Sequence, residues 1–285
     1  MSIVDNMIVC AGLMRRYLTP QMLRDIDDVA RFRKPYVLVE GFPILPNSAS
    51  FATNIALGSI SLLSARPVAY KEENSGILIR EVRPLPQTAT QQSSQGRVDL
   101  AMHTDMTFLR FQSESNHPIL AAAPDFLILS CVKNDPHVAT RIVTLDQIKQ
   151  ALSPSDLSEL YGQNFTIRTP DSVTPTRTIA DLAILFHHAT LGDLIRYNDA
   201  YCTGQTPAAI LALDSLQAFV RDDQTGEEIL LEPGKVLVFN NRQVLHGRGA
   251  IPESSDPSQD RWFKRVYAQR LDTELSSGDP LLQST

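Results

Sequence analysis

Leu100-Ala-Met-His103-Thr-Asp105 decides the expected fold, because an apolar strand here ends in a histidine and an aspartate two residues apart. Side chains at positions i and i+2 of a strand lie on one side of the sheet, so both can reach one metal ion. A third ligand must come from elsewhere, and His246 in Val244-Leu-His246-Gly-Arg248 is the candidate. Two imidazoles and one carboxylate on one face of an iron ion leave the opposite face open for co-substrate and oxygen.

Composition indicates an ordinary globular protein and gives weak evidence against some classes of partner. The chain has 285 residues, 43% hydrophobic and 20% charged, which is enough to bury a large core. The net charge of −6 argues against nucleic acid or a membrane surface, since both attract basic proteins. Cys10, Cys131 and Cys202 lack metal-binding spacing and are typical of reduced thiols in a cytoplasmic protein. Neither a signal peptide nor an apolar run of about 18 residues is expected.

Helical patterns dominate residues 1–75, and short strands dominate residues 76–271. Helices are expected from Thr19-Pro20 to residue 30, over residues 48–63 and after Thr206-Pro207, with a strand at 36–40. Strands are expected at 77–82, 98–102, 126–132, 138–143, 165–168, 228–231, 236–239 and 263–268. This order predicts one α+β domain over residues 1–285, with a β-barrel or jelly-roll core braced by helices.

Several sequence blocks together resemble a known family. They are Gln91-Gln-Ser-Ser-Gln-Gly96 before His103, Pro124-Asp-Phe-Leu-Ile-Leu-Ser-Cys131, Asp135-Pro-His-Val-Ala-Thr140, Leu231-Glu-Pro-Gly-Lys-Val-Leu-Val-Phe-Asn-Asn-Arg242 with Leu245-His-Gly-Arg248, and Asp260-Arg-Trp-Phe-Lys-Arg265. In this order the chain is similar to the clavaminate synthase-like branch of the taurine dioxygenase superfamily, which includes asparagine and arginine hydroxylases. The resemblance implies a double-stranded β-helix, Fe(II), and 2-oxoglutarate and oxygen as co-substrates.

The resemblance also implies residue roles. His103, Asp105 and His246 match the iron ligands and are the expected catalytic centre. Arg261 matches the arginine that holds the distal carboxylate of 2-oxoglutarate, with Arg265 beside it on the same strand, and Thr140 matches a threonine that contacts this carboxylate. A planar guanidinium suits such a carboxylate because it donates two parallel hydrogen bonds. The alternative for both arginines is a solvated strand edge.

The chain departs from the branch in three places. Asp105 stands where many members have glutamate, which leaves the iron chemistry intact. Asn240-Asn241-Arg242 replaces an Asp-Asn-Arg sequence and is expected to alter hydrogen bonding around the ligands. Residues 106–123 look longer than usual, and we expect either a lid over the substrate or a surface insertion.

The expected substrate is a free amino acid or a close derivative such as a cyclic dipeptide, hydroxylated at an unactivated sp3 carbon. The family resemblance implies this substrate class. It also suggests a role in a specialised-metabolite pathway such as antibiotic biosynthesis. Asp199 is the candidate partner of the substrate amine, because a buried ammonium needs a carboxylate. Gln92, Ser93 and Ser94 are further candidates for substrate contact. The sequence does not predict an oligomeric state.

Other functions stay open or lack support. Desaturation, epoxidation or ring closure on a non-amino-acid substrate would use the same cofactors. A non-catalytic metal-binding barrel would explain the histidines but not the position of Arg261. No GxSxG, Walker A or GxGxxG motif supports a hydrolase, an NTPase or a dinucleotide enzyme. His187 and His188 are adjacent, so in a strand they point to opposite faces; with His117 and His137 they are expected to be structural.

Overall fold

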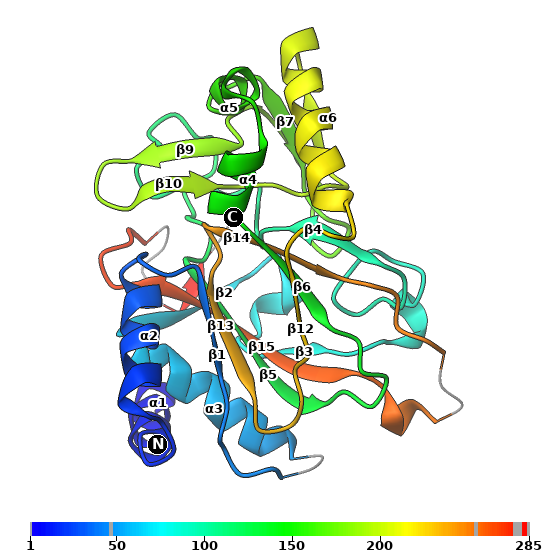
Figure 1. Ribbon diagram of the computed structural model, residues 1–285. Coiled ribbons are helices and arrows are strands. Elements are labelled where there is room, and N and C mark those ends of the chain that lie inside the picture. Colours follow the sequence, from blue (N-terminus) through cyan, green and yellow to red (C-terminus); the bar gives the residue numbers. More distant parts are fainter. Residues whose placement is uncertain (1, 46–47, 254–255, 276–280, 284–285) are drawn as a thin grey trace.

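Antiparallel sheets and helices combine in this protein, whose computed structural model describes residues 2–45, 48–253, 256–275 and 281–283. The strands gather in the middle of the molecule, and helices lie at two ends of it (Figure 1). The expected mixture of helices and strands is therefore confirmed. No helix in these described ranges is long and apolar enough to cross a membrane.

The largest sheet has seven strands and runs through the centre of the molecule. Its main path is β1 (Tyr36–Val39), β13 (Val236–Asn240), β5 (Phe126–Lys133), β15 (Trp262–Arg270), β2 (Ala65–Tyr70) and β16 (Leu282–Gln283), and β3 (Arg80–Val82) also pairs with β15. All these pairs are antiparallel except β16 with β2. Because β1 and β2 belong to this sheet, the helix-rich part expected over residues 1–75 is not separate from the strand-rich core.

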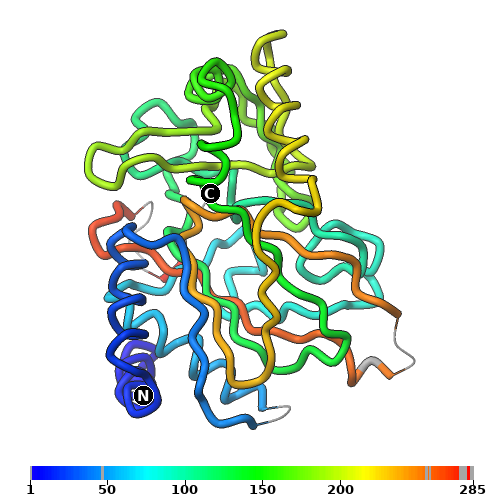
Figure 2. Tube along the Cα trace, viewed as in Figure 1, coloured from blue at the N-terminus to red at the C-terminus, as the bar shows by residue number. Residues whose placement is uncertain are grey.

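A second sheet of four strands carries the histidines. Its order is β12 (Glu227–Ile229), β6 (Thr140–Thr144), β14 (Val244–Arg248) and β4 (Leu100–His103). Two small sheets lie beside it: β11 (Cys202–Gly204), β7 (Phe165–Arg168) and β8 (Thr178–Leu182) form one, and β9 (Leu185–His188) and β10 (Gly192–Ile195) form the other. The chain therefore crosses repeatedly between the sheets, which brings distant segments side by side (Figure 2).

The helices begin where the sequence offers a hydroxyl cap. They are α1 (Ile3–Met14), α2 (Pro20–Ala30), α3 (Ala49–Leu62), α4 (Leu145–Ala151), α5 (Pro154–Leu160) and α6 (Pro207–Arg221), with short 3-10 turns at Asn74–Gly76, Pro86–Thr88 and Pro257–Gln259. Thr19 and Thr206 each accept a hydrogen bond from the backbone two or three residues into the helix, with proline at the first position. Ser48 caps α3 in the same way, which confirms the expected start of that helix.

Alternation along the central strands divides the interior into two cores. Leu127 and Leu129 of β5 pack towards the four-stranded sheet, whereas Phe126 and Ile128 pack in the core that includes α1, α2 and α3. The N-terminal helices cover one face of the large sheet (Figure 1). The opposite face is left for the second sheet, and the histidines lie between the two.

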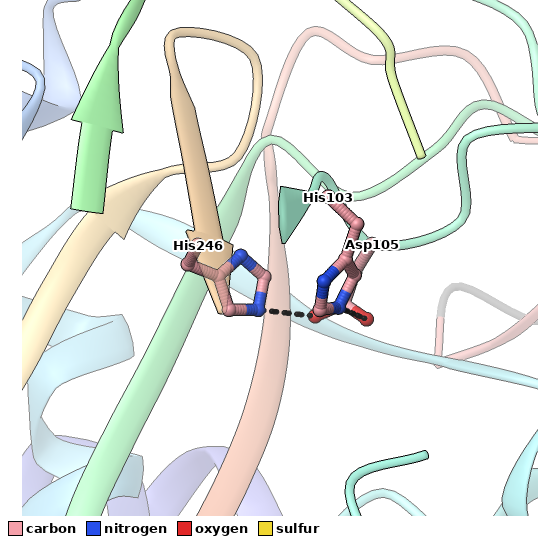
Figure 3. Close-up of side chains that lie close together, drawn as sticks. All are labelled: His103, Asp105 and His246. Carbon is pink, nitrogen blue, oxygen red and sulfur yellow. Dashed lines mark ion pairs between the residues drawn. The ribbon is translucent and has the colours of Figure 1, made fainter. Parts of the chain in front are cut away.

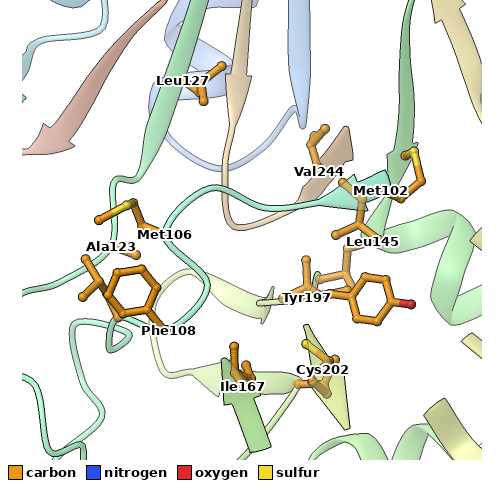
Figure 4. Packing of buried hydrophobic residues seen from close by; sticks show 14 of the residues in the cluster. Met102, Met106, Phe108, Ala123, Leu127, Leu145, Ile167, Tyr197, Cys202 and Val244 are labelled. Carbon is orange, nitrogen blue, oxygen red and sulfur yellow. The ribbon is translucent and has the colours of Figure 1, made fainter. Parts of the chain in front are cut away.

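Much of the segment 106–123 packs into the interior. Phe108, Leu109 and Phe111 are buried, and Met106, Phe108 and Ala123 pack together in Figure 4. Arg196 forms a buried ion pair with Glu114 of this segment. The segment thus combines buried anchors with exposed positions, which include Ser115, Asn116 and Leu120, and the choice between a lid and a surface insertion stays a prediction.

Candidate active site

Three side chains from two paired strands form the centre of the site. His103 ends β4, Asp105 follows it by two residues, and His246 lies in β14 directly opposite His103 in the strand register. His103 Nε2 is 3.8 Å from Asp105 Oδ1, and His246 Nε2 is 3.6 Å from Asp105 Oδ2. Figure 3 shows both imidazoles directed at the carboxylate. The strand pairing thus assembles the expected triad.

The residues fit a divalent metal of the iron type. One ligand atom from each lies within 4.8 Å of the others, and all three residues are buried. Ligands at right angles around an ion, each about 2.1 Å away, lie roughly 3 Å apart, so a small contraction would close this set. Asp105 Oδ2 is buried and has no hydrogen-bond partner among the described residues, although a buried carboxylate oxygen normally has one. A bound cation would supply that partner.

Electrostatics keep His246 and Asp105 in their metal-binding protonation states. Burial and the neighbouring His103 lower the pKa of His246 to about 3, so the imidazole is neutral at physiological pH. Burial acts to raise the pKa of Asp105, but the charge of Arg265 outweighs it and this pKa stays below its usual value. Neutral imidazole and ionised carboxylate are the forms that coordinate metals.

Hydrogen bonds from outside the triad fix its orientation. His103 Nδ1 lies 2.8 Å from the carbonyl oxygen of Ala101, which leaves Nε2 to face the carboxylate. Asn241 Oδ1 accepts from the Asp105 backbone N–H at 2.8 Å, and Asn241 Nδ2 donates to the Asp105 carbonyl at 2.9 Å. The Asn240-Asn241-Arg242 segment therefore holds the backbone that carries the ligand.

A small cavity behind the triad ends at a buried cation. Its walls include His103, His246, Thr140, Arg261 and Arg265. Arg261 is only 3% exposed; its Nη2 donates to Thr140 Oγ1 at 2.9 Å, and its guanidinium stacks on Phe263. No carboxylate pairs with Arg261 in the described ranges. Burial and the charge of Arg248 lower the pKa of Arg261 to about 9.

A second cavity, in front of the triad, contains a charged cluster that the sequence did not reveal. Glu73 Oε1 accepts from Arg80 Nη1 and from Arg265 Nη2, each at 2.6 Å, and Arg265 Nη1 lies 3.4 Å from Asp105 Oδ1. Glu73 Oε2 accepts no hydrogen bond from the part of the chain that the structure describes. All four side chains line the cavity, so two cations and the Glu73 carboxylate lie near the metal-ligand candidate Asp105.

Arg265 lies between the two cavities, whereas Arg261 lies at the end of the cavity behind the triad. It lines both, but its hydrogen bonds go to Glu73 and Asp105. Burial acts to lower its pKa, yet Tyr267, Glu73 and Asp105 hold the pKa above its usual value. Arg261 and Thr140 therefore line the cavity behind the triad, whereas Arg265 borders both cavities and contacts Asp105.

The predicted substrate residues separate into two groups. Gln92, Ser93 and Ser94 line the cavity in front of the triad, and Arg248 holds their loop through bonds to the carbonyls of Ser93 and Gly96. Asp199 lies outside this cavity, in a larger neighbouring hollow. Its carboxylate accepts from Arg221 Nε at 2.8 Å and from the hydroxyl of Tyr197 at 2.7 Å.

Sequence reasoning missed Glu73, Arg80 and Asn198, which line the same cavity. Glu73 precedes His103 by 30 positions in a turn, where no motif marks it. Isolated bridges join Glu73 to Val173 and His103 to Asn198, so backbone pairing brings these residues together. The sequence drew attention to Asp199, but its neighbour Asn198 is the residue that lines this cavity.

Comparison with known proteins finds the same architecture. Residues 19–267 match the family described as Taurine catabolism dioxygenase TauD, TfdA family. The L-asparagine oxygenase of Streptomyces coelicolor is 27% identical over 236 residues, covering 80% of this chain and 66% of that protein. The L-lysine 3-hydroxylase of Catenulispora acidiphila is 25% identical over 211 residues, covering 71% and 54%. The chain thus spans just under two thirds and about half of these two relatives.

A solved structure supports the fold itself. The crystal structure of asparagine oxygenase in complex with Fe(II), 2S,3S-3-hydroxyasparagine and succinate superposes with a TM-score of 0.79. The match covers 96% of this chain and 88% of that one, at 23% sequence identity. The arrangement of sheets and helices is therefore shared.

Proposed function

From the premise that the chain belongs to the taurine catabolism dioxygenase TauD, TfdA family, we propose that it is an Fe(II)- and 2-oxoglutarate-dependent dioxygenase that hydroxylates a free amino acid or a close derivative. The carbon attacked is an unactivated sp3 carbon. The relatives named for asparagine and lysine oxidation support an amino-acid substrate. A role in specialised metabolism is part of this proposal.

One observation carries the co-substrate assignment: the unpaired guanidinium of Arg261 at the end of the cavity behind the triad. An isolated buried charge is unfavourable unless an opposite charge reaches it. A dicarboxylate that binds the metal through one end would bring its free carboxylate to Arg261 and Thr140. A non-catalytic metal-binding barrel would have no use for such a cation at this depth.

The charged cluster in front of the triad supports an amino-acid substrate. A zwitterion needs one carboxylate for its ammonium and one cation for its carboxylate. Glu73 offers a free oxygen, Oε2, and Arg80 and Arg265 offer guanidinium groups beside it. We therefore assign these three residues, with Gln92, Ser93 and Ser94, to the binding of the amino-acid backbone.

When bound, Fe(II) with 2-oxoglutarate and oxygen supplies an oxidant strong enough to remove hydrogen from an unactivated carbon, with succinate and carbon dioxide as co-products. His103, Asp105 and His246 would hold the ion, and Arg261 would fix the depth of the co-substrate. Glu73 and the two arginines would orient the substrate so that one carbon faces the metal. Desaturation, epoxidation and ring closure are the alternatives to hydroxylation. They would use the same cofactors, and the placement of the substrate decides between them.

We also propose that the seven-stranded and four-stranded sheets are the two halves of a double-stranded β-helix in a single domain. Phe239 of β13 lies 4.8 Å from His246 of β14, ring centre to ring centre, so the sheets pack face to face at the site. Leu129 and Thr140, one from each sheet, line the same cavity.

Succinate release tests the proposal. The protein loaded with Fe(II) is incubated with 2-oxoglutarate, oxygen and each proteinogenic amino acid, and the products are identified by mass. We expect succinate coupled to a gain of one oxygen atom for at least one amino acid. Succinate formation that no amino acid or amino-acid derivative stimulates would contradict the substrate class, and failure to bind 2-oxoglutarate would contradict the enzyme class.

A further inference from the structure

The charged and the uncharged residues that line the cavity in front of the triad come from different segments of the chain. Glu73, Arg80, Asp105 and Arg265 are its charged lining residues. The wall formed by Pro170, Ser172, Val173, Asn198 and Tyr201 is uncharged at neutral pH. If the backbone of an amino acid binds to the charged residues, its side chain is left with the neutral wall.

Two acidic residues next to this wall do not contribute to it. Asp171 lies between Pro170 and Ser172, but it forms an ion pair with Arg168 at 2.9 Å and does not line the cavity. Asp199 follows Asn198, but it pairs with Arg221 and faces the larger hollow. In the described ranges, no carboxylate is therefore available to a cation at the far end of the substrate.

We propose that the substrate side chain is short and uncharged. This rests on the proposed function and narrows it. An ammonium or guanidinium placed against Val173 and Asn198 would be buried without an opposite charge, and a carboxylate there would lack a cation. The cavity offers about 50 Å³, about four water-sized volumes, which favours a side chain of few atoms.

Asn198 is the residue of the neutral wall whose backbone pairs with a member of the triad, His103. Its Oδ1 already accepts from the backbone N–H of Ala200 at 3.0 Å. Its Nδ2 donates to no partner in the part of the chain described, and the backbone bridge to His103 keeps it beside the metal position. A side chain with a hydrogen-bond acceptor, such as an amide or hydroxyl, therefore suits this wall best.

Direct binding to the metal- and 2-oxoglutarate-loaded protein tests the inference. Asparagine, aspartate and 2,3-diaminopropionate are close in size but carry neutral, negative and positive side chains. Under anaerobic conditions we expect calorimetry to show asparagine binding at least about 30-fold more tightly than either charged analogue, equivalent to about 2 kcal/mol. Lysine and arginine are expected to bind no more tightly than these two.

Two matched substitutions then locate the discrimination. Asn198→Asp places a carboxylate on the neutral wall and is expected to shift the preference towards diaminopropionate by at least about tenfold. Asp199→Asn makes the reverse change one residue away, outside the cavity, and is expected to leave the ratio between the amino acids unchanged. Loss of discrimination in Asp199→Asn, or an unaltered ratio in Asn198→Asp, would overturn the assignment of the wall.

The outcomes separate the two proposals. If charged amino acids bind and stimulate succinate release as well as asparagine does, the inference is wrong while the proposed function stands. If a longer neutral side chain, such as that of norleucine, binds better than every short one, the size limit is wrong. If no amino acid binds, the proposed function fails and the inference fails with it.

Discussion

Replacement of Arg261 by alanine should have opposite effects on co-substrate binding and on the protein alone. In the absence of a dicarboxylate, Arg261 is a buried cation whose polar contacts are Thr140 Oγ1 and, at 3.4 Å, the carbonyl of Val138. Its removal therefore relieves an unpaired charge, and we expect the free energy of unfolding to change by less than about 1 kcal/mol despite the lost stacking on Phe263. In the complex, the same change leaves a buried carboxylate without its partner, which costs about 2–5 kcal/mol.

That cost corresponds to a rise in the 2-oxoglutarate dissociation constant of about 30- to 5,000-fold. Anaerobic calorimetry with metal-loaded protein measures it directly, and urea unfolding of the metal-free protein measures the other effect. Arg261→Lys should recover part of the loss, since an ammonium cannot donate two parallel bonds. Thr140→Val removes a single hydrogen bond to a charged group and should weaken binding by about tenfold. Binding by Arg261→Ala within threefold of the original protein would refute this account of the cavity.

Three other substitutions test separate parts of the site and its surroundings. Asp105→Ala should abolish retention of Fe(II) and turnover while circular dichroism stays unchanged; normal product formation would contradict the ligand assignment. Glu73→Gln should raise the KM for the amino acid at least tenfold and that for 2-oxoglutarate less than threefold, because only the substrate loses its ammonium partner; steady-state kinetics decides, and equal shifts would count against the role. Burial and the charge of Arg196 lower the pKa of His117 to about 4, below its value of 6.5 in an unfolded chain, so the unfolded state binds the proton first and stability falls as pH drops through this range. Between pH 7 and pH 5, the free energy of unfolding of His117→Gln should fall by about 2 kcal/mol less than that of the original protein, as measured by urea unfolding without metal. Identical losses in the two proteins would show that another group is responsible.

Local signals in the sequence located many of the elements correctly. Thr19-Pro20, Ser48 and Thr206-Pro207 mark helix starts because a capping hydroxyl acts within a few residues. Membership of β1 and β2 in the large sheet could not be predicted, since pairing with β13 and β15 joins segments about 200 residues apart. The strand expected at 77–82 is reduced to Arg80–Val82, because a 3-10 turn occupies Asn74–Gly76 just before it.

In the site too, residues marked by nearby sequence could be predicted, whereas residues placed by contacts between distant segments could not. The spacing of His103 and Asp105 at the end of one strand predicts two ligands on the same side of a metal ion. The basic strand after His246 is where the family resemblance places the co-substrate anchor, Arg261. Glu73 carries no such signal, because its role arises from two guanidiniums that reach it from β3 and β15. Whether Asn198 or its acidic neighbour faces the cavity depends on a backbone bridge to β4, which a pattern of residue types does not encode.

The direct pairing of His103 with His246 has a consequence for how the site comes into being. The two positions are 143 residues apart, so their contact closes a long loop and belongs to the late part of folding. We therefore expect a metal ion not to act as a folding nucleus, since its ligands come together when β4 and β14 pair in register. Once bound, it fastens these strands together and should slow unfolding without accelerating refolding, a difference that stopped-flow kinetics with and without metal would reveal. The chain is therefore expected to complete its fold first and to acquire iron as a finished protein.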